Sequence, residues 1–337
     1  METIDARGVT QTGARGTAVV RTRILPRGLS VTEVGLGAAQ LGNLYRETTE
    51  EQAAETVETA WNVGIRYFDT APHYGLGLSE LRLGRLLADR PRRDYVLSTK
   101  VGRLLEPNPD PDPGRDAGFA VPATLIRRFD LTRDGIHRSM EESLSRLRTD
   151  YVDIAYLHDP DDMEDAALAT AFPALVELRE QGVVRAIGAG MNYAAPLARF
   201  VREADIDVVM VAGRFTLLDR SAQEELLPAA LERGVAVVAA GVYNSGILAT
   251  RRPSDDATYD YHAADATVLR RARLMADQCE QASVELPAAA LQFPLRHPAV
   301  ACVVVGVRGR NQVLSTVDRY NLGVPDDLYD RLDETQR

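Results

Sequence analysis

Four side chains capable of proton chemistry lie close to the ends of apolar chain segments. Asp69, Lys100 and His158 each end or directly follow a short segment rich in β-branched and aromatic residues, and Tyr74 follows Asp69 by five positions. Such segments are typical of parallel strands that are buried on both faces. Because the carboxyl ends of parallel strands meet at one edge, we expect all four side chains at the same mouth.

The four residue types together indicate proton transfer by a tyrosine. A free phenol has a pKa of about 10, and a nearby ammonium favours the phenolate and lowers that value. We expect Lys100 to have this effect on Tyr74, and Asp69 to keep Lys100 charged and oriented. A neutral His158 can hydrogen-bond the substrate oxygen. The set predicts a general acid for carbonyl reduction, or a general base for alcohol oxidation.

Lys100 is the only lysine among 39 lysine and arginine residues. An ammonium is a compact point charge, whereas a guanidinium is a broad planar fork, so the position favours a role that arginine cannot fill. Each of the four residues alone has an ordinary structural explanation, as a helix cap, a surface cation or a core group. An alternative chemistry is a Schiff-base lyase that uses Lys100.

Eight strand segments alternate with helical segments, which predicts an α/β fold of the (β/α)₈ TIM-barrel type. The expected strands are 33–36, 66–70, 95–99, 151–158, 186–190, 208–212, 235–240 and 302–307. The expected helices are 49–63, 79–88, 132–147, 166–181, 196–203, 221–233, 266–282 and 311–319. We expect an N-terminal tail over 1–17 and a single barrel domain over 18–337.

Three segments interrupt this alternation. Residues 18–29 predict an N-terminal β-hairpin that closes the bottom of the barrel. The segments 103–129 and 251–265 follow the third and seventh strands, are rich in polar residues, proline or glycine, and are expected to be long βα loops lining the substrate pocket.

Composition limits the classes of partner. The net charge of −10 argues against nucleic acid and anionic membranes, and no apolar stretch reaches the length of a membrane span. Cys279 and Cys302 match no metal or redox spacing, so we expect no metal. The polar N-terminus lacks the apolar run of a signal peptide, so we expect none. We therefore expect a cytoplasmic enzyme with a small sugar or aldehyde as its substrate, and leave homo-oligomerisation open.

The four residues and their neighbours resemble the aldo-keto reductases. The resemblance rests on the segment from Gly64 to Ala71, on Tyr74, on Lys100 after a Ser-Thr pair, and on His158 before an aspartate. It extends from about Leu25 to Arg319. It implies a tetrad of Asp69, Tyr74, Lys100 and His158 in a barrel that binds NAD or NADP without a Rossmann domain.

The resemblance also implies cofactor contacts, although several positions depart from the family pattern. Met191 and Ala212 replace a serine and a glutamine, and Ala240 replaces a ring that stacks on the nicotinamide, so Tyr243 or another ring is expected to take that role. Arg308 is expected to meet a 2′-phosphate or the adenine, which leaves NAD against NADP open. The implied cofactor-binding residues are Asn192, Gly241, Tyr243, Ser245, Gly246, Gly306, Arg308, Gln312 and Thr316.

The departures are similar to a bacterial branch of sugar dehydrogenases in this family. That branch implies oxidation of the anomeric carbon of a D-threo-aldose, such as L-fucose, to a lactone. The alternatives are pyridoxal 4-dehydrogenase activity, general NADPH-dependent aldehyde or ketone reduction, and a weakly active regulatory subunit that binds the cofactor. Candidate substrate contacts, each of which could equally order a loop, are His73, Arg127, Asp130 and Asp159.

Overall fold

A closed barrel of eight parallel strands forms the centre of the computed structural model, which describes residues 20–110 and 114–335. The strands, in order around the barrel, are β3 (Val34–Gly37), β4 (Tyr67–Asp69), β5 (Val96–Val101), β8 (Val152–His158), β9 (Val184–Met191), β10 (Val208–Ala212), β11 (Ala236–Ala240) and β14 (Val300–Gly306). Strand β14 pairs with β3 and closes the ring. The predicted fold class and all eight predicted strands are confirmed, with ends shifted by a few residues.

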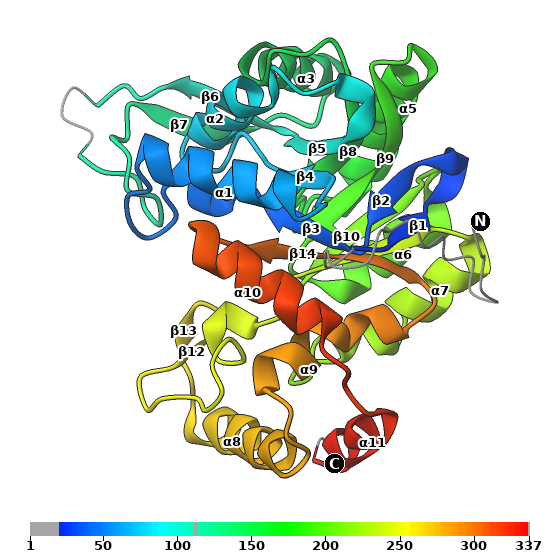
Figure 1. Cartoon of the computed structure of the whole chain (residues 1–337). Helices are drawn as coiled ribbons and strands as arrows, with labels where there is room; N and C mark the ends of the chain where they lie inside the picture. Colours follow the sequence, from blue (N-terminus) through cyan, green and yellow to red (C-terminus); the bar gives the residue numbers. More distant parts are fainter. Residues whose placement is uncertain (1–19, 111–113, 336–337) are drawn as a thin grey trace, which may run out of the picture.

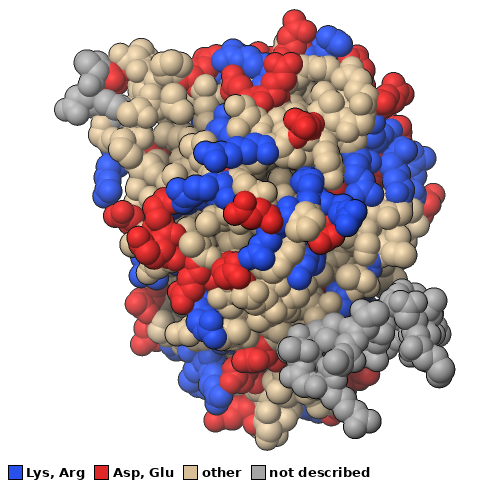
Figure 2. Space-filling view, turned by 45° about the horizontal axis from the view of Figure 1, so that its top comes forward, with Lys and Arg blue, Asp and Glu red and all other residues tan. Residues whose placement is uncertain are grey.

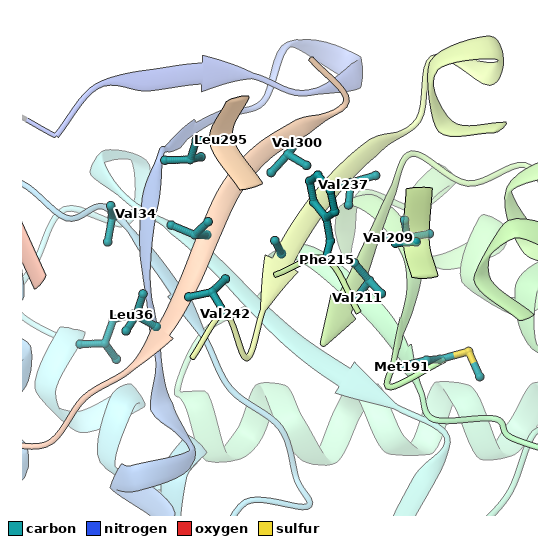
Figure 3. Close-up of a cluster of buried hydrophobic side chains, with 14 of the residues drawn as sticks. Val34, Leu36, Met191, Val209, Val211, Phe215, Val237, Val242, Leu295 and Val300 are labelled. Carbon is teal, nitrogen blue, oxygen red and sulfur yellow. The ribbon is translucent and has the colours of Figure 1, made fainter. Parts of the chain in front are cut away.

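The strands are apolar on both faces because both faces are buried. Val209 and Val211 of β10 point outward into a layer shared with the helices, and Figure 3 shows them near Val237 of β11 in the same cluster. Met210, between the two valines, points into the barrel and packs in a separate inner cluster. This arrangement explains why the strand segments show no polar alternation.

Eleven helices lie among the described residues. They are α1 (Glu50–Asn62), α2 (Leu78–Leu87), α3 (Arg133–Leu147), α4 (Glu164–Ala166), α5 (Phe172–Glu180), α6 (Ala194–Glu203), α7 (Leu226–Arg233), α8 (Ala266–Gln281), α9 (Leu286–Gln292), α10 (Arg310–Asn321) and α11 (Asp326–Glu334). Helix α1 begins with a capping box between Thr49 and Gln52, as its sequence indicates. The structure divides two predicted helices: a π-helical turn separates α4 from α5, and a 3-10 turn precedes α7.

Helices α9 and α11 were not predicted. Six of the seven residues of α9 are buried, so it lacks the polar face that marks an amphipathic helix. Helix α11 is short and mostly acidic, with only three buried residues.

A hairpin of β1 (Thr22–Ile24) and β2 (Ser30–Thr32) covers the bottom of the barrel. The predicted range 18–29 was wrong at its end, because Pro26–Gly28 form the turn and the second strand starts only at Ser30. Leu25, Leu29 and Val31 pack against the inner cluster of the barrel. The predicted tail 1–17, with residues 18 and 19, lies outside the described residues.

The two predicted pocket loops each contain a short antiparallel hairpin. Strand β6 (Arg103–Pro107) pairs with β7 (Leu125–Phe129), and β12 (Thr258–Tyr259) pairs with β13 (His262–Ala263). Both hairpins lie at the left of Figure 1, at the end of the barrel opposite the β1–β2 hairpin. The two long loops therefore surround the carboxyl ends of the strands.

The surface mixes charges of both signs. On the face that Figure 2 shows, basic and acidic side chains are interspersed and no large area has one sign. Within residues 20–110 and 114–335, no helix is both long and apolar enough to cross a membrane.

A buried carboxylate ties the bottom hairpin to the barrel and to α10. Glu33 accepts hydrogen bonds from Arg21 Nε at 2.9 Å and Arg23 Nε at 2.6 Å, and from the Tyr320 hydroxyl. Burial opposes ionisation, but Tyr320 and the two arginines outweigh it and lower the pKa of Glu33. Its stabilising effect is therefore present above the unfolded-state pKa of about 4.3 and is lost as the pH falls through the lower folded-state value.

We expect Glu33→Gln to lower the free energy of unfolding by about 2 kcal/mol at pH 7, because the two partly exposed arginines lose their charged partner. The difference from the wild type should shrink below pH 4. Urea unfolding at pH 7 and again below pH 4 measures this difference in the free energy of unfolding. Glu55→Gln, at an exposed glutamate, is the matched control. Equal stability of Glu33→Gln and the control at pH 7 would contradict this assignment.

Candidate active site

The structure places the four predicted catalytic side chains in one cavity. Asp69 ends β4, His158 ends β8, and Lys100 lies near the end of β5, which runs between those two strands in the barrel. Tyr74 lies on the loop that joins β4 to α2. All four line a cavity of about 420 Å³ at the carboxyl ends of the strands.

Lys100 and Asp69 form a buried ion pair at the base of this cavity. The ammonium donates to Asp69 Oδ2 at 2.8 Å and to the carbonyl of Thr70 at 2.9 Å. Ser98 donates to the other carboxylate oxygen at 2.7 Å, so both oxygens of Asp69 are held. Burial opposes the charge on Lys100, but Asp69 and Tyr74 outweigh it and raise the pKa of Lys100. Lys100 therefore stays charged at neutral pH.

Tyr74 lies directly over this ion pair. The Lys100 nitrogen is 4.7 Å from the centroid of the Tyr74 ring. Burial raises the pKa of Tyr74 and Lys100 lowers it, with a net rise. The expected net lowering of the phenol pKa was therefore wrong, because the cost of burying a phenolate exceeds the attraction of one ammonium that Asp69 already neutralises. At neutral pH the phenol carries its proton.

His158 is a neutral imidazole facing Tyr74. The two ring centroids are 6.1 Å apart. Burial, followed by the charges of Arg103 and Lys100, holds the pKa of His158 well below its ordinary value. Its Nε2 lies 3.5 Å from the carboxylate of Asp159, an acceptor that favours the proton on Nε2. A neutral ring in this tautomer can donate a hydrogen bond to a substrate oxygen.

Two of the four candidate substrate contacts line the cavity. They are Asp159 and His73. Burial, together with the charges of Arg127 and Arg103, lowers the pKa of His73 to about 3, so this ring is neutral. Arg127 instead binds Asp116 through two hydrogen bonds of 2.6 and 2.8 Å and donates to the carbonyl of His73.

Asp130 also lies away from the cavity. Its Oδ1 accepts hydrogen bonds from the amide and hydroxyl of Thr132, the N-cap of α3. Arg127 and Asp130 therefore stabilise the loop between β5 and α3 through hydrogen bonds and do not line the cavity.

Three of the nine candidate cofactor residues line the same cavity: Asn192, Gly241 and Gly306. Arg308 lies outside it and donates to the Thr48 hydroxyl and the Leu44 carbonyl, both at 2.7 Å.

The other cofactor candidates also lie outside the cavity. The backbone of Gln312 accepts from Thr316 within α10, and its side chain accepts from the amide of Arg308. Ser245 and Gly246 are exposed on the loop after β11, and the half-buried Tyr243 packs against the core.

The half of the mouth opposite the tetrad has room for a flat ring. Strands β9, β10, β11 and β14 present four small residues to the cavity, Gly190, Ala212, Ala240 and Gly306, and the other lining residues of these strands are apolar: Met191, Met210 and Val304. Gln40 and Asn192 bring carboxamides to the same cavity, and the buried Oε1 of Gln40 has no hydrogen-bond partner within the described part of the chain. These residues fit a nicotinamide ring with its own carboxamide.

Sequence reasoning missed an aromatic wall on the solvent side of the cavity. Tyr45, Phe119 and Tyr261 come from three different loops. The amide of Tyr45 donates to the carbonyl of Gly118 at 2.7 Å, which joins two of these loops. Tyr45 and Tyr261 both have positive φ, of 61° and 68°, and large exposed side chains. For Phe119 and Tyr261, the signal available in the sequence was an aromatic residue within a long polar loop; Tyr45 lies outside those loops, between β3 and α1.

Known proteins resemble this chain over nearly its whole length. The aldo/keto reductase family matches residues 33–337. D-threo-aldose 1-dehydrogenase from a Pseudomonas species is 47% identical over 313 residues, 92% of this chain and 95% of that protein. Pyridoxal 4-dehydrogenase from Microbacterium luteolum is 40% identical over 324 residues, with 90% and 94% covered.

Solved structures agree with the sequence comparisons. An aldo-keto reductase from Bacillus halodurans, in its holo form, has a TM-score of 0.78 and 26% identity, and the match covers 94% of this chain and 97% of that one. The chain therefore belongs to the aldo/keto reductase family and is an NAD(P)-dependent oxidoreductase with a (β/α)₈ barrel.

Proposed function

We propose that this protein oxidises the anomeric carbon of an aldose, L-fucose or another D-threo-aldose, to a lactone, with Tyr74 as the general base. The observation that carries the proposal is the buried Lys100–Asp69 pair beneath Tyr74, with a neutral His158 opposite. The aldose as substrate is supported by the 47% identity to a D-threo-aldose 1-dehydrogenase and by the polar wall that His73 and Asp159 give the cavity.

In this mechanism the anomeric hydroxyl lies between the Tyr74 oxygen and His158 Nε2. A nicotinamide held against Gly190, Ala212 and Ala240 would supply the hydride acceptor. The anomeric C–H bond breaks with its electron pair leaving as hydride, the hydroxyl proton goes to Tyr74, and the carbon–oxygen double bond of the lactone forms. Lys100 stabilises negative charge on Tyr74, Asp69 fixes Lys100, and His158 orients the oxygen.

A second candidate is pyridoxal oxidation. It is supported by the 40% identity to a pyridoxal 4-dehydrogenase and by the aromatic wall of Tyr45, Phe119 and Tyr261, which suits a flat heteroaromatic ring. The same four catalytic groups would serve either substrate, so the loops that line the cavity decide which of the two substrates binds.

A substrate panel separates the candidates. L-fucose, other D-threo-aldoses, pyridoxal and simple aldehydes are assayed with both NAD and NADP at the absorbance band of the reduced nicotinamide. We expect kcat/KM for the best aldose to exceed that for pyridoxal by at least about tenfold, the effect of one or two well-placed hydrogen bonds. Turnover of pyridoxal alone, or of simple aldehydes alone, would overturn the aldose assignment.

We expect Lys100→Arg to lower kcat by at least about 100-fold although it keeps the positive charge. The site at Lys100 is only 3% exposed, and a guanidinium would displace Tyr74 or lose the short contact with Asp69. Cofactor binding, followed by quenching of protein fluorescence, serves as the control and should change little. A kcat near that of the wild type would show that the site needs only a charge.

The raised pKa of Tyr74 predicts that kcat depends on pH in the oxidation direction and not in the reduction direction. The base form of Tyr74 is scarce at neutral pH, so kcat for oxidation should rise about tenfold per pH unit between pH 7 and 9. The acid form is fully populated over this range, so kcat for carbonyl reduction should stay nearly constant.

The profiles are measured with aldose deuterated at the anomeric carbon, to confirm that hydride transfer limits the rate. Tyr74→Phe should lower kcat by at least about 100-fold and remove the slope. A flat oxidation profile despite a full isotope effect would exclude Tyr74 as the base.

A further inference from the structure

Asp159 occupies an unusual backbone position beside the catalytic histidine. It follows His158 directly, its amide donates to the carbonyl of Gly190 at 3.0 Å, and its φ is +42°. Left-handed backbone costs free energy for any residue other than glycine, although aspartate tolerates it better than most. Such conformations concentrate at functional sites, where the surrounding structure maintains them. Here the turn brings the carboxylate into the cavity wall.

A second loop fixes the orientation of this carboxylate. Arg103, at the start of β6, donates to Asp159 Oδ2 at 2.7 Å. Its guanidinium lies over the Phe129 ring at 4.8 Å, and one of its nitrogens is 3.5 Å from Nδ1 of His73. Arg103 therefore has little freedom to move.

The other oxygen of Asp159 remains available to a ligand. Oδ1 receives no hydrogen bond from the residues that the structure describes, while Oδ2 has the Arg103 bond. Burial raises the pKa of Asp159 to about 6, and the neighbouring Asp161 adds to the rise, against the lowering effect of Arg103 and Lys100. Above pH 7 the group is a carboxylate, which only accepts hydrogen bonds.

We propose that Asp159, oriented by Arg103, is the specificity-determining residue that binds the hydroxyl on the carbon next to the reacting carbon of the substrate. The proposal rests on the aldose oxidation proposed above and deepens it. Asp159 thereby selects sugars against aldehydes that lack a neighbouring hydroxyl.

The distances between the groups carry this assignment. Asp159 Oδ2 is 3.5 Å from His158 Nε2, the atom expected to hold the reacting oxygen, so the free Oδ1 of the same carboxylate also lies close to that oxygen. Oxygens on adjacent sugar carbons are separated by a similar distance, so a sugar whose anomeric oxygen contacts His158 brings its next hydroxyl to Asp159. A substrate with hydrogen in place of that hydroxyl leaves a partly buried carboxylate oxygen without a donor, which is costly.

The test compares L-fucose with its 2-deoxy analogue. In the wild type at pH 8, we expect kcat/KM for L-fucose to exceed that for the analogue by about 10- to 100-fold, the effect of a hydrogen bond to a charged group. Asp159→Gly, which accepts the positive φ, should reduce this ratio to within about threefold of one. Asp159→Asn keeps one acceptor oxygen and should give an intermediate ratio.

Asp162→Asn is the matched control. Asp162 lies on the same loop with a φ of +60°, is exposed, and does not line the cavity, so the wild-type ratio should persist. Because the readout is a ratio between two substrates, a general loss of stability or of cofactor binding does not mimic the expected result.

The outcomes separate this inference from the proposed function. A wild type that oxidises L-fucose, with a ratio that Asp159→Gly leaves unchanged, would overturn the role of Asp159 and leave the aldose assignment intact. A wild type that oxidises no aldose would overturn both. Loss of the ratio in Asp159→Gly, with retention in Asp162→Asn, would establish the carboxylate as the selecting group.

Discussion

The buried ion pair between Lys100 and Asp69 is the constraint on which the proposed catalytic arrangement depends. Two charges removed from water lose several kcal/mol of solvation each, and this is offset only when the geometry is good and the remaining polar atoms are satisfied. The pair meets that condition through Ser98 and the carbonyl of Thr70. Strands β4 and β5 must therefore be neighbours in a fixed register, because Asp69 pairs directly with Ser98 across them. Closure of the barrel thus sets the chemistry as well as the fold.

The barrel mouth divides into two halves with different side chains. Strands β4, β5 and β8, consecutive in the barrel, contribute Asp69, Lys100 and His158. Strands β9, β10, β11 and β14 contribute Gly190, Ala212, Ala240 and Gly306 together with apolar side chains, so that wall carries no charged group. A substrate held against the first half and a flat ring held against the second would meet near the barrel axis. The placement of small residues is therefore as necessary as the placement of the reactive ones.

Sequence alone predicted the features that depend on local chain properties. Eight apolar segments predicted the eight strands of the barrel. The reactive side chains near strand ends predicted that Asp69, Tyr74, Lys100 and His158 meet in one cavity, because parallel strands bring their carboxyl ends together. Features that depend on tertiary contacts were harder to predict. The short helix α9 is nearly all buried, so its sequence shows no helical periodicity. The turn at Pro26–Gly28 is short and has strand-like sequence before and after it, so its position in the hairpin was difficult to predict. Tyr45, Phe119 and Tyr261 could not be grouped, since only the folded loops bring them to one wall.

The same distinction separates reaction from specificity. Groups on the strands are held by the barrel and determine what chemistry is performed, whereas loops determine which molecule reaches them. Asp159 stands at the boundary, one residue beyond β8 on a backbone with positive φ, and Arg103 holds it from the neighbouring loop. Arg127 acts in the same way on another part of the loop wall: it donates one hydrogen bond to the carbonyl of His73 and another to the carboxylate of Asp116. Arginines that do not line the cavity thus hold the loop wall in place, as the proposed selection among similar sugars would require.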